Sequence, residues 1–268
     1  MKYNITKELL TQYLLEKKTN REIAEIIKCP YQTIQYYIKK YGLITYQEKH
    51  KLPNYTINKI DTKEKAYLLG FICCDGAVSS NKIVELTVEK NDKEILDFIA
   101  NYINCRVYID NTYDKKNKRF PRARLSKKIP DISTFIGGDL KQNRHIPIVK
   151  EELVRYVLLG LFDADGCLTW GVRKDKQRIW QKISFTTSLS IAIGIQNILI
   201  KYLQISTIVR PKTNEKKCYV IEFANKYDVL KFLKYIYQDN FIVLHRKYSK
   251  YKALRLKLEE NGEGAIKQ

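Results

Sequence analysis

The chain has 268 residues, of which 44% are hydrophobic, and its formal net charge is +20, from 49 Lys and Arg against 29 Asp and Glu. This excess of positive charge disfavours self-association, so we expect a monomer, and it favours a polyanionic partner over a solvated lysine surface that binds nothing. No run of 18 apolar residues, no signal-peptide core and no CxxC pair occurs. We therefore expect no membrane partner and an intracellular location, in a bacterial or phage-infected cell or an organelle.

Residues 1–47 are predicted to form three short helices. Apolar residues recur on one face of a first helix over Lys7–Lys17, and Thr19-Asn20-Arg21-Glu22 is a capping box that starts the second. Pro30 suits the first turn of the third helix, and Gly42 can end that helix in the left-handed region. This order is typical of a helix-turn-helix DNA-binding module.

The alternative for this segment is a three-helix core that packs on the rest of the protein. We favour contact with DNA, because the outward positions of the third helix carry side chains that can hydrogen-bond to bases or phosphates. The candidates are Gln32, Thr33, Gln35 and Lys39.

Residues 48–62 lack periodicity and predict a linker, at the end of which Asp61 is expected to cap the next helix. Residues 63–147 and 148–256 then follow one plan, namely helix, two strands, helix, two strands, helix, before a tail at 257–268. Strand alternation places one face of each sheet on the helices and leaves the other open. Basic side chains on the open faces are candidates for a DNA groove: Arg106, Arg122, Arg124, Lys182 and Lys217.

Two stretches of the chain are nearly the same, AYLLGFICCDG at residues 66–76 and YVLLGLFDADG at residues 156–166. Each is an apolar helix with an internal glycine, Gly70 or Gly160, although glycine inside a helix costs about 0.5–1 kcal/mol relative to alanine. Incidental placement is a poor explanation for both glycines. We expect two helices whose backbones nearly touch at a pseudo-twofold axis, within an α+β fold of two αββαββα halves plus a small all-α domain.

Asp75 and Asp165 end these two helices, where the helix dipole is negative and acids are disfavoured. One such Asp-Gly would be read as a turn. Two matched copies that meet at the axis instead favour a bound divalent cation, Mg²⁺ or Mn²⁺, with both aspartates as ligands, because hard oxygen ligands and substrate phosphates suit these ions. Paired metals can activate water against a phosphodiester.

The two stretches resemble the paired signature of LAGLIDADG homing endonucleases of the single-chain type. LLGLFDADG at 158–166 is a close match, whereas LLGFICCDG at 68–76 departs at Cys73 and Cys74. The acid that the family uses for metal binding and catalysis is kept as Asp75 and Asp165. Asp163 stands at a position that is not the main metal ligand in the family.

The resemblance implies saddle-shaped DNA-binding sheets and a sequence-specific endonuclease that cuts a long, asymmetric double-stranded target and leaves short 3′ overhangs. It also implies one catalytic lysine from each half, near the scissile phosphates. Lys141 is the candidate in the first half, with Lys128 and Arg144 as rivals, and Lys247 in the second half, with Arg246 beside it.

Two other functions stay open at this point. The same fold serves RNA maturases, which would make intron RNA the partner, and it occurs with a helix-turn-helix in non-cleaving transcription regulators. Retention of the acid in both motifs favours the nuclease.

Overall fold

The computed structural model describes residues 3–16, 18–43, 54–113, 119–173, 178–213, 215, 217–239 and 241–260. The chain divides into two compact units, residues 1–53 and residues 54–268. Within the described residues no helix is both long enough and apolar enough to cross a bilayer.

The first unit contains three helices, α1 (Lys7–Leu15), α2 (Asn20–Ile27) and α3 (Tyr31–Lys40). The predicted capping box is present, since the Thr19 amide donates to Glu22 Oε2 at 2.6 Å and the Glu22 amide donates to Thr19 Oγ1 at 3.3 Å. The helices enclose their own small core, made of Ile5, Leu10, Ile23, Ala24, Ile34 and Ile38.

The predicted linker is wrong in its second part, because residues 54–62 lie against the first half of the larger unit. Ile57 is fully buried in the main core, and its amide donates to Asp131 Oδ2 at 2.9 Å. Ile57, the partly buried Tyr55 and Ile60, and a few hydrogen bonds of the backbone hold this segment, and they leave no periodic pattern in the sequence. The earlier part, 48–53, lies outside the described residues.

The helix that follows also begins differently from the prediction. Thr62 is the N-cap, with its Oγ1 accepting from the Lys65 amide at 3.3 Å. Asp61, the predicted cap, instead pairs with the Lys65 ammonium at 2.8 Å. Asp61 stands one residue too early to accept from the free amides of the first turn.

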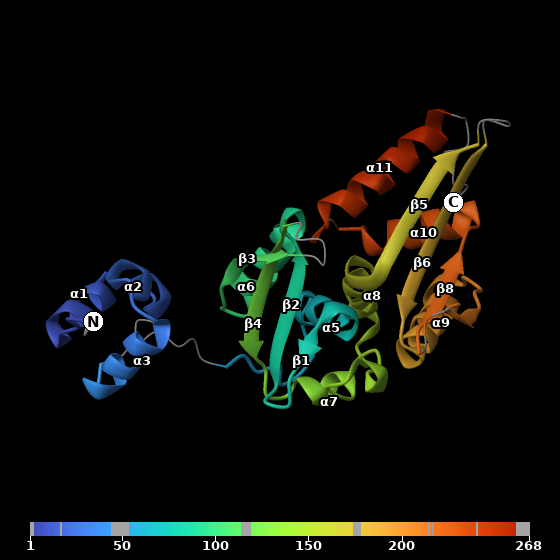
Figure 1. The fold of residues 1–268 in the computed structure, drawn as a ribbon. Helices are drawn as coiled ribbons and strands as arrows, with labels where there is room; N and C mark the ends of the chain where they lie inside the picture. Colours follow the sequence, from blue (N-terminus) through green and yellow to red (C-terminus); the bar gives the residue numbers. More distant parts are fainter. Residues whose placement is uncertain are drawn as a thin grey trace. The chain divides into compact units, whose positions relative to one another are not determined.

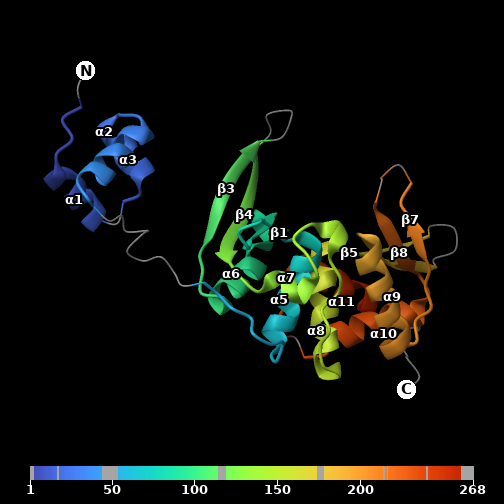
Figure 2. The same ribbon diagram turned by 90° about the horizontal axis from the view of Figure 1, so that it is seen from below.

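The two αββαββα halves are confirmed (Figures 1 and 2). The first half contains α5 (Lys63–Asp75), β1 (Ala77–Val78), β2 (Ile83–Glu89), α6 (Lys93–Tyr102), β3 (Val107–Tyr113), β4 (Arg119–Lys128) and α7 (Ile132–Ile136). The second half contains α8 (Glu151–Asp165), β5 (Gly166–Val172), β6 (Ile179–Thr187), α9 (Leu189–Leu203), β7 (Val209–Pro211), β8 (Tyr219–Phe223) and α10 (Lys226–Ile236).

Both sheets are antiparallel and have the same strand order, β1-β2-β4-β3 in the first half and β5-β6-β8-β7 in the second. Helices α5 and α8 lie side by side between the two sheets (Figure 1). One hydrophobic core runs through both halves and includes the buried faces of both helices.

A last helix, α11 (His245–Glu260), was not anticipated. The predicted end of the second half at residue 256 falls inside it, and Leu254 and Leu258 are both buried. The helix contacts β5, where Trp170 Nε1 donates to the Lys250 carbonyl at 3.1 Å. Lysines outnumber the few apolar residues that anchor this helix, so the sequence shows no clear amphipathic pattern and indicates only a basic C-terminal segment. Residues 261–268 of the predicted tail lie outside the described residues.

Candidate functional site at the helix seam

Helices α5 and α8 meet at a seam where their backbones approach each other as closely as their glycines predict. A Cβ on Gly70 would stand 2.3 Å from the Val157 carbonyl oxygen, and one on Gly160 would stand 2.2 Å from the Tyr67 carbonyl oxygen. These contacts are reciprocal, because each partner in one half is 90 residues from its counterpart in the other. Glycine is therefore required at both positions by the opposing backbone, and the seam is the pseudo-twofold axis.

The seam brings Asp75 and Asp165 together at the ends of α5 and α8. Burial, together with the negative charge of Asp165, raises the pKa of Asp75 to about 6. Burial also raises the pKa of Asp165, which the nearby Lys141 ammonium opposes. Two partly buried carboxylates that repel each other leave a concentration of negative charge for a cation to neutralise.

Two buried cations cap the helices that carry these acids. The Arg144 guanidinium donates from Nη1 to the carbonyls of Ile72 and Gly76, each at 2.7 Å, at the end of α5. The Lys247 ammonium donates to the carbonyls of Phe162 and Gly166 at 2.5 and 2.6 Å, at the end of α8. The capped carbonyls are again 90 residues apart, so Arg144 and Lys247 are counterparts.

This arrangement changes the interpretation of Lys247. The sequence predicts its ammonium near a scissile phosphate, but the side chain is only 4% exposed and its hydrogen atoms point to backbone carbonyls. Desolvation lowers the pKa of Lys247 to about 8. The positive charge that offsets the helix dipole thus comes in part from the protein itself, and a catalytic role for Lys247 stays a prediction.

Lys141 has the surroundings that the prediction requires of a phosphate-facing lysine. It is exposed in the short turn Lys141–Asn143, and its charge lowers the pKa of both Asp75 and Asp165. The rival Lys128 is exposed at the end of β4. Lys217, predicted on a strand, instead lies in a turn with a φ of 64°, where its ammonium is 3.5 Å from Gln142 Oε1, beside Lys141.

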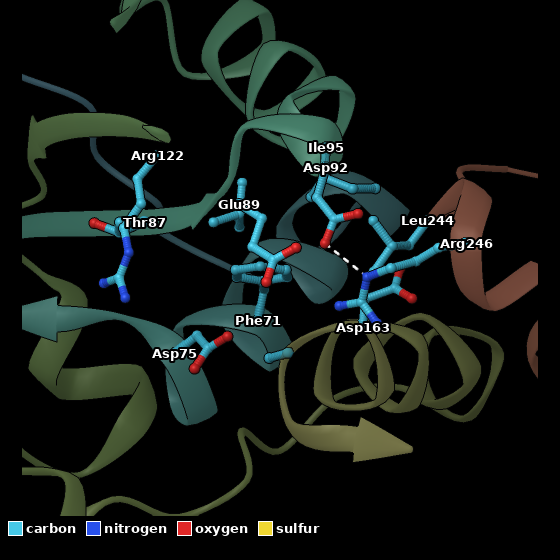
Figure 3. A pocket seen from close by; sticks show the side chains of 12 residues that line it. Phe71, Asp75, Thr87, Glu89, Asp92, Ile95, Arg122, Asp163, Leu244 and Arg246 are labelled. Carbon is cyan, nitrogen blue, oxygen red and sulfur yellow. Dashed lines mark hydrogen bonds and ion pairs between the residues drawn. The ribbon is translucent and has the colours of Figure 1, made fainter. Parts of the chain in front are cut away.

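A pocket of about 250 Å³ opens beside Asp75 (Figure 3). Asp163 lines it from α8 and is 3% exposed. Its Oδ2 accepts from the Tyr67 hydroxyl at 3.0 Å, and its Oδ1 has no hydrogen-bond partner among the residues that the structure describes. Burial raises the pKa of Asp163 to about 7. Arg246 crosses the pocket to Asp92 at 2.8 Å. The Arg246–Asp92 pair spans 154 residues of sequence, and no local motif could have indicated it.

The open sheet faces carry the predicted basic side chains together with acids. Arg124 on β4 pairs with Glu85 at 3.2 Å and Asp110 at 3.4 Å, and Lys182 on β6 pairs with Glu222 at 3.1 Å. Arg122 is exposed on the same face of β4 as Arg124. Arg106 is exposed immediately before β3. The sequence identified the basic positions but not the carboxylates that pair with them.

The predicted DNA-contacting side chains of α3 are mostly exposed within their own unit. Gln32, Gln35 and Lys39 are exposed and Thr33 is half-buried. Gln35 Nε2 donates to the Tyr31 hydroxyl at 3.0 Å, so these two side chains act as one polar group on the outer face of the helix.

The donors at the seam fit a hard divalent cation, although they do not complete its coordination. Among the residues that the structure describes, no three His, Cys, Asp or Glu side chains form a metal-binding cluster. Two carboxylates with raised pKa values supply hard oxygen atoms, and a cation of the Mg²⁺ type commonly takes its remaining ligands from water and substrate phosphates.

Comparison with known proteins agrees with this geometry. Residues 152–237, from α8 to α10, match the family model of a LAGLIDADG-like domain. The fold is similar to that of the meganuclease I-SmaMI bound to uncleaveable DNA, with a TM-score of 0.50 and 12% identity over 74% of this chain and 91% of that chain. It is also similar to the homing endonuclease I-GzeII in complex with its DNA target, with a TM-score of 0.50 and 9% identity over 75% and 92% of the two chains.

I-SmaMI bound to uncleaved DNA in the presence of calcium ions gives a TM-score of 0.50 and 12% identity over 76% of this chain and 93% of that chain. A comparison with curated proteins found no match. The fold and the seam thus define a single-chain protein built from two related halves. Residues 152–237 match a LAGLIDADG-like domain and the fold is similar to that of LAGLIDADG endonucleases, so the resemblance predicted from the sequence is confirmed.

Proposed function

We propose that this chain is a metal-dependent endonuclease that cuts both strands of an asymmetric double-stranded DNA target. The observation that carries the proposal is the pair of carboxylates, Asp75 and Asp165, held at one seam by pseudo-equivalent helices. Each would serve one strand. The two halves differ in sequence, so the target would lack twofold symmetry.

Asp75 and Asp165 would hold Mg²⁺ or Mn²⁺ together with phosphate oxygens of the DNA. A divalent cation there would supply Lewis-acid stabilisation of the phosphodiester and a more acidic water. Lys141, exposed beside both acids, would orient the phosphate or the water by its positive charge. Arg144 and Lys247 would keep the ends of α5 and α8 in place during the reaction.

The basic sheet faces and the helix-turn-helix unit would supply the contacts that bind DNA. Arg106, Arg122, Arg124, Lys182 and Lys217 would follow the groove and backbone, and Gln32, Thr33, Gln35 and Lys39 would extend the footprint. If about ten phosphates are neutralised, the logarithm of the binding constant falls with the logarithm of salt concentration with a slope near −9.

The test is selection of cleaved molecules from a pool of randomised duplexes in Mg²⁺, followed by cleavage of the selected site in a plasmid. Asp75→Asn and Asp165→Asn should each reduce cleavage of one strand by about a thousandfold, the equivalent of roughly 4 kcal/mol of metal stabilisation. Asp97→Asn on α6 is the matched control and should cut at the normal rate. Unimpaired cutting by both seam variants would overturn the assignment.

The same protein preparation distinguishes the other two functions. Tight binding to an intron RNA without cleavage of any DNA would indicate a maturase. Metal-independent binding to a DNA site without cleavage would indicate a transcription regulator. Either result would contradict the proposed endonuclease.

A further inference from the structure

The two carboxylates at the seam have different neighbours. Cys74 on α5 and Thr187 at the end of β6 stand beside Asp165, where hydrogen bonding from their thiol and hydroxyl opposes the rise that burial causes in the pKa of its carboxyl. The two donors also contact each other, with Cys74 Sγ 3.9 Å from Thr187 Oγ1, and they are 1% and 9% exposed.

The pseudo-twofold axis identifies the residues that occupy the positions equivalent to Cys74 and Thr187 beside Asp75. Cys74 precedes Asp75 as Ala164 precedes Asp165, so Ala164 is the counterpart of Cys74. The counterpart of Thr187 follows from sheet register, because Cys167 pairs with Ser184 as Ala77 pairs with Glu85. The residue three positions beyond Ser184 is Thr187, and the residue three positions beyond Glu85 is Val88.

Both donors are therefore replaced by apolar groups in the first half. Val88 and Ala164 line the pocket beside Asp75, so apolar side chains stand there in the places that the hydroxyl and the thiol occupy beside Asp165. Asp75 itself points into this pocket in Figure 3. The seam glycines and the cationic caps make the same contacts in both halves. The two halves therefore differ in the groups beside each aspartate and not in the way the helices pack or are capped.

We propose that Cys74 and Thr187 are positioning residues that fix the direction of the Asp165 carboxylate. The Asp75 carboxylate takes up its direction only when substrate binds. The strand served by Asp165 is therefore cut first. A carboxylate with a fixed direction loses less rotational freedom when it engages a cation and a phosphate, which speeds the step that it serves. Immobilising one side chain corresponds to a rate difference of roughly five- to tenfold. The predicted order of cutting rests on the proposed endonuclease activity. The contacts of Cys74 and Thr187 with Asp165 do not depend on that activity.

The contacts are tested first, by infrared spectroscopy of the metal-free protein without DNA. The S–H stretching band of Cys74, assigned by its loss in Cys74→Ser, is expected at the lowered frequency of a hydrogen-bonded thiol. Asp165→Ala should raise that frequency, and Asp75→Ala should leave it unchanged. An unchanged band in Asp165→Ala, or an equal change in both variants, would overturn the positioning role.

The order of cutting is tested with a duplex labelled on both strands, in which the Asp165-served strand is the one that Asp165→Asn leaves intact. Thr187→Val and Cys74→Ala should slow that strand roughly five- to tenfold and leave the other strand unchanged. Thr187→Ser, which restores the hydroxyl, should recover the normal rate. Equal slowing of both strands would indicate a general structural defect and would overturn the proposal.

A reciprocal variant keeps the proposal falsifiable if a loss of donors also disturbs folding. Val88→Thr with Ala164→Cys places both donors beside Asp75, where the pocket of about 250 Å³ leaves room for them. This variant should cut the Asp75-served strand faster and narrow the difference between the strands. If no DNA is cut by any variant, the endonuclease proposal fails, and the infrared result still decides whether Cys74 and Thr187 position Asp165.

Discussion

The two halves share their topology, their seam and the position of their helix caps, yet they differ in the groups that carry out each task. Gly70 and Gly160 meet the opposing backbone in the same way, whereas Arg144 caps one helix and Lys247 the other. Backbone contacts permit no substitution, but any cation of suitable reach can satisfy carbonyl groups. The halves have therefore kept the geometry of the seam and varied its chemistry.

The seam glycines give the largest expected effect. Gly70→Ala and Gly160→Ala should each destabilise the larger unit by about 3 kcal/mol or more, since a Cβ would overlap backbone atoms that cannot rotate away. Urea unfolding measures both. Gly194→Ala is the matched control, because its nearest contact at 2.8 Å is the flexible Ile146 side chain. Markedly unequal losses at the two seam positions would contradict their equivalence.

The caps should be almost as sensitive. Arg144→Met and Lys247→Met each leave carbonyls at a helix end without a charged donor, which should cost about 2–3 kcal/mol in thermal unfolding. Arg144→Lys should retain much of the stability, because one ammonium serves the same carbonyls in the second half. Lys128→Met, on an exposed lysine, should change stability by less than about 0.5 kcal/mol. A loss at only one cap would show that the two are not equivalent.

The charge of Asp75 should lower the stability of the folded protein, although the proposed function requires that charge. The folded pKa of Asp75 is about 6, above the ordinary value of 3.8, so the folded state binds more protons and ionisation destabilises it as pH rises through this window. Asp75→Asn should therefore stabilise the metal-free protein by up to about 3 kcal/mol above pH 6. The gain should disappear as pH falls from 6 towards 4. A variant less stable than the native chain at pH 7 would refute this.

The smallest effect concerns the open sheet faces. Arg122→Ala should weaken DNA binding about fivefold and make the salt slope less steep by about 1, because its guanidinium is exposed and pairs with no acid among the described residues. Arg124→Ala should cost less, since this guanidinium already pairs with Glu85 and Asp110. Fluorescence anisotropy at several salt concentrations separates the two. A larger loss for Arg124 would mean that its acidic partners release it on DNA.

The sequence predicted the features that repeat. The two motifs, their glycines and their terminal acids recur at a fixed spacing, and a pseudo-twofold axis follows from that recurrence. The capping box at Thr19 was predictable for a different reason, since its hydrogen bonds join residues three apart.

The features that the sequence did not predict depend on single long-range contacts. Ile57 enters the core from a segment without periodicity, and Arg144 reaches a helix end 68 to 72 residues earlier in the chain. Lys247 was found as a basic residue, but its direction depends on α11, whose lysine-rich sequence hides its buried leucines. Cys74 was noted as a departure from the motif, and its contact with Thr187 required the register of β6.

The shared core has a consequence for synthesis of the chain on the ribosome. Every residue of α5 from Ala66 to Cys74 is buried, largely by a helix that begins at Glu151. At about 5–20 residues per second, the 90 residues between the two motifs take roughly 5–18 s to translate. During that interval the first motif is an exposed apolar helix without its partner, so the nascent chain is vulnerable to aggregation until the second motif has left the exit tunnel.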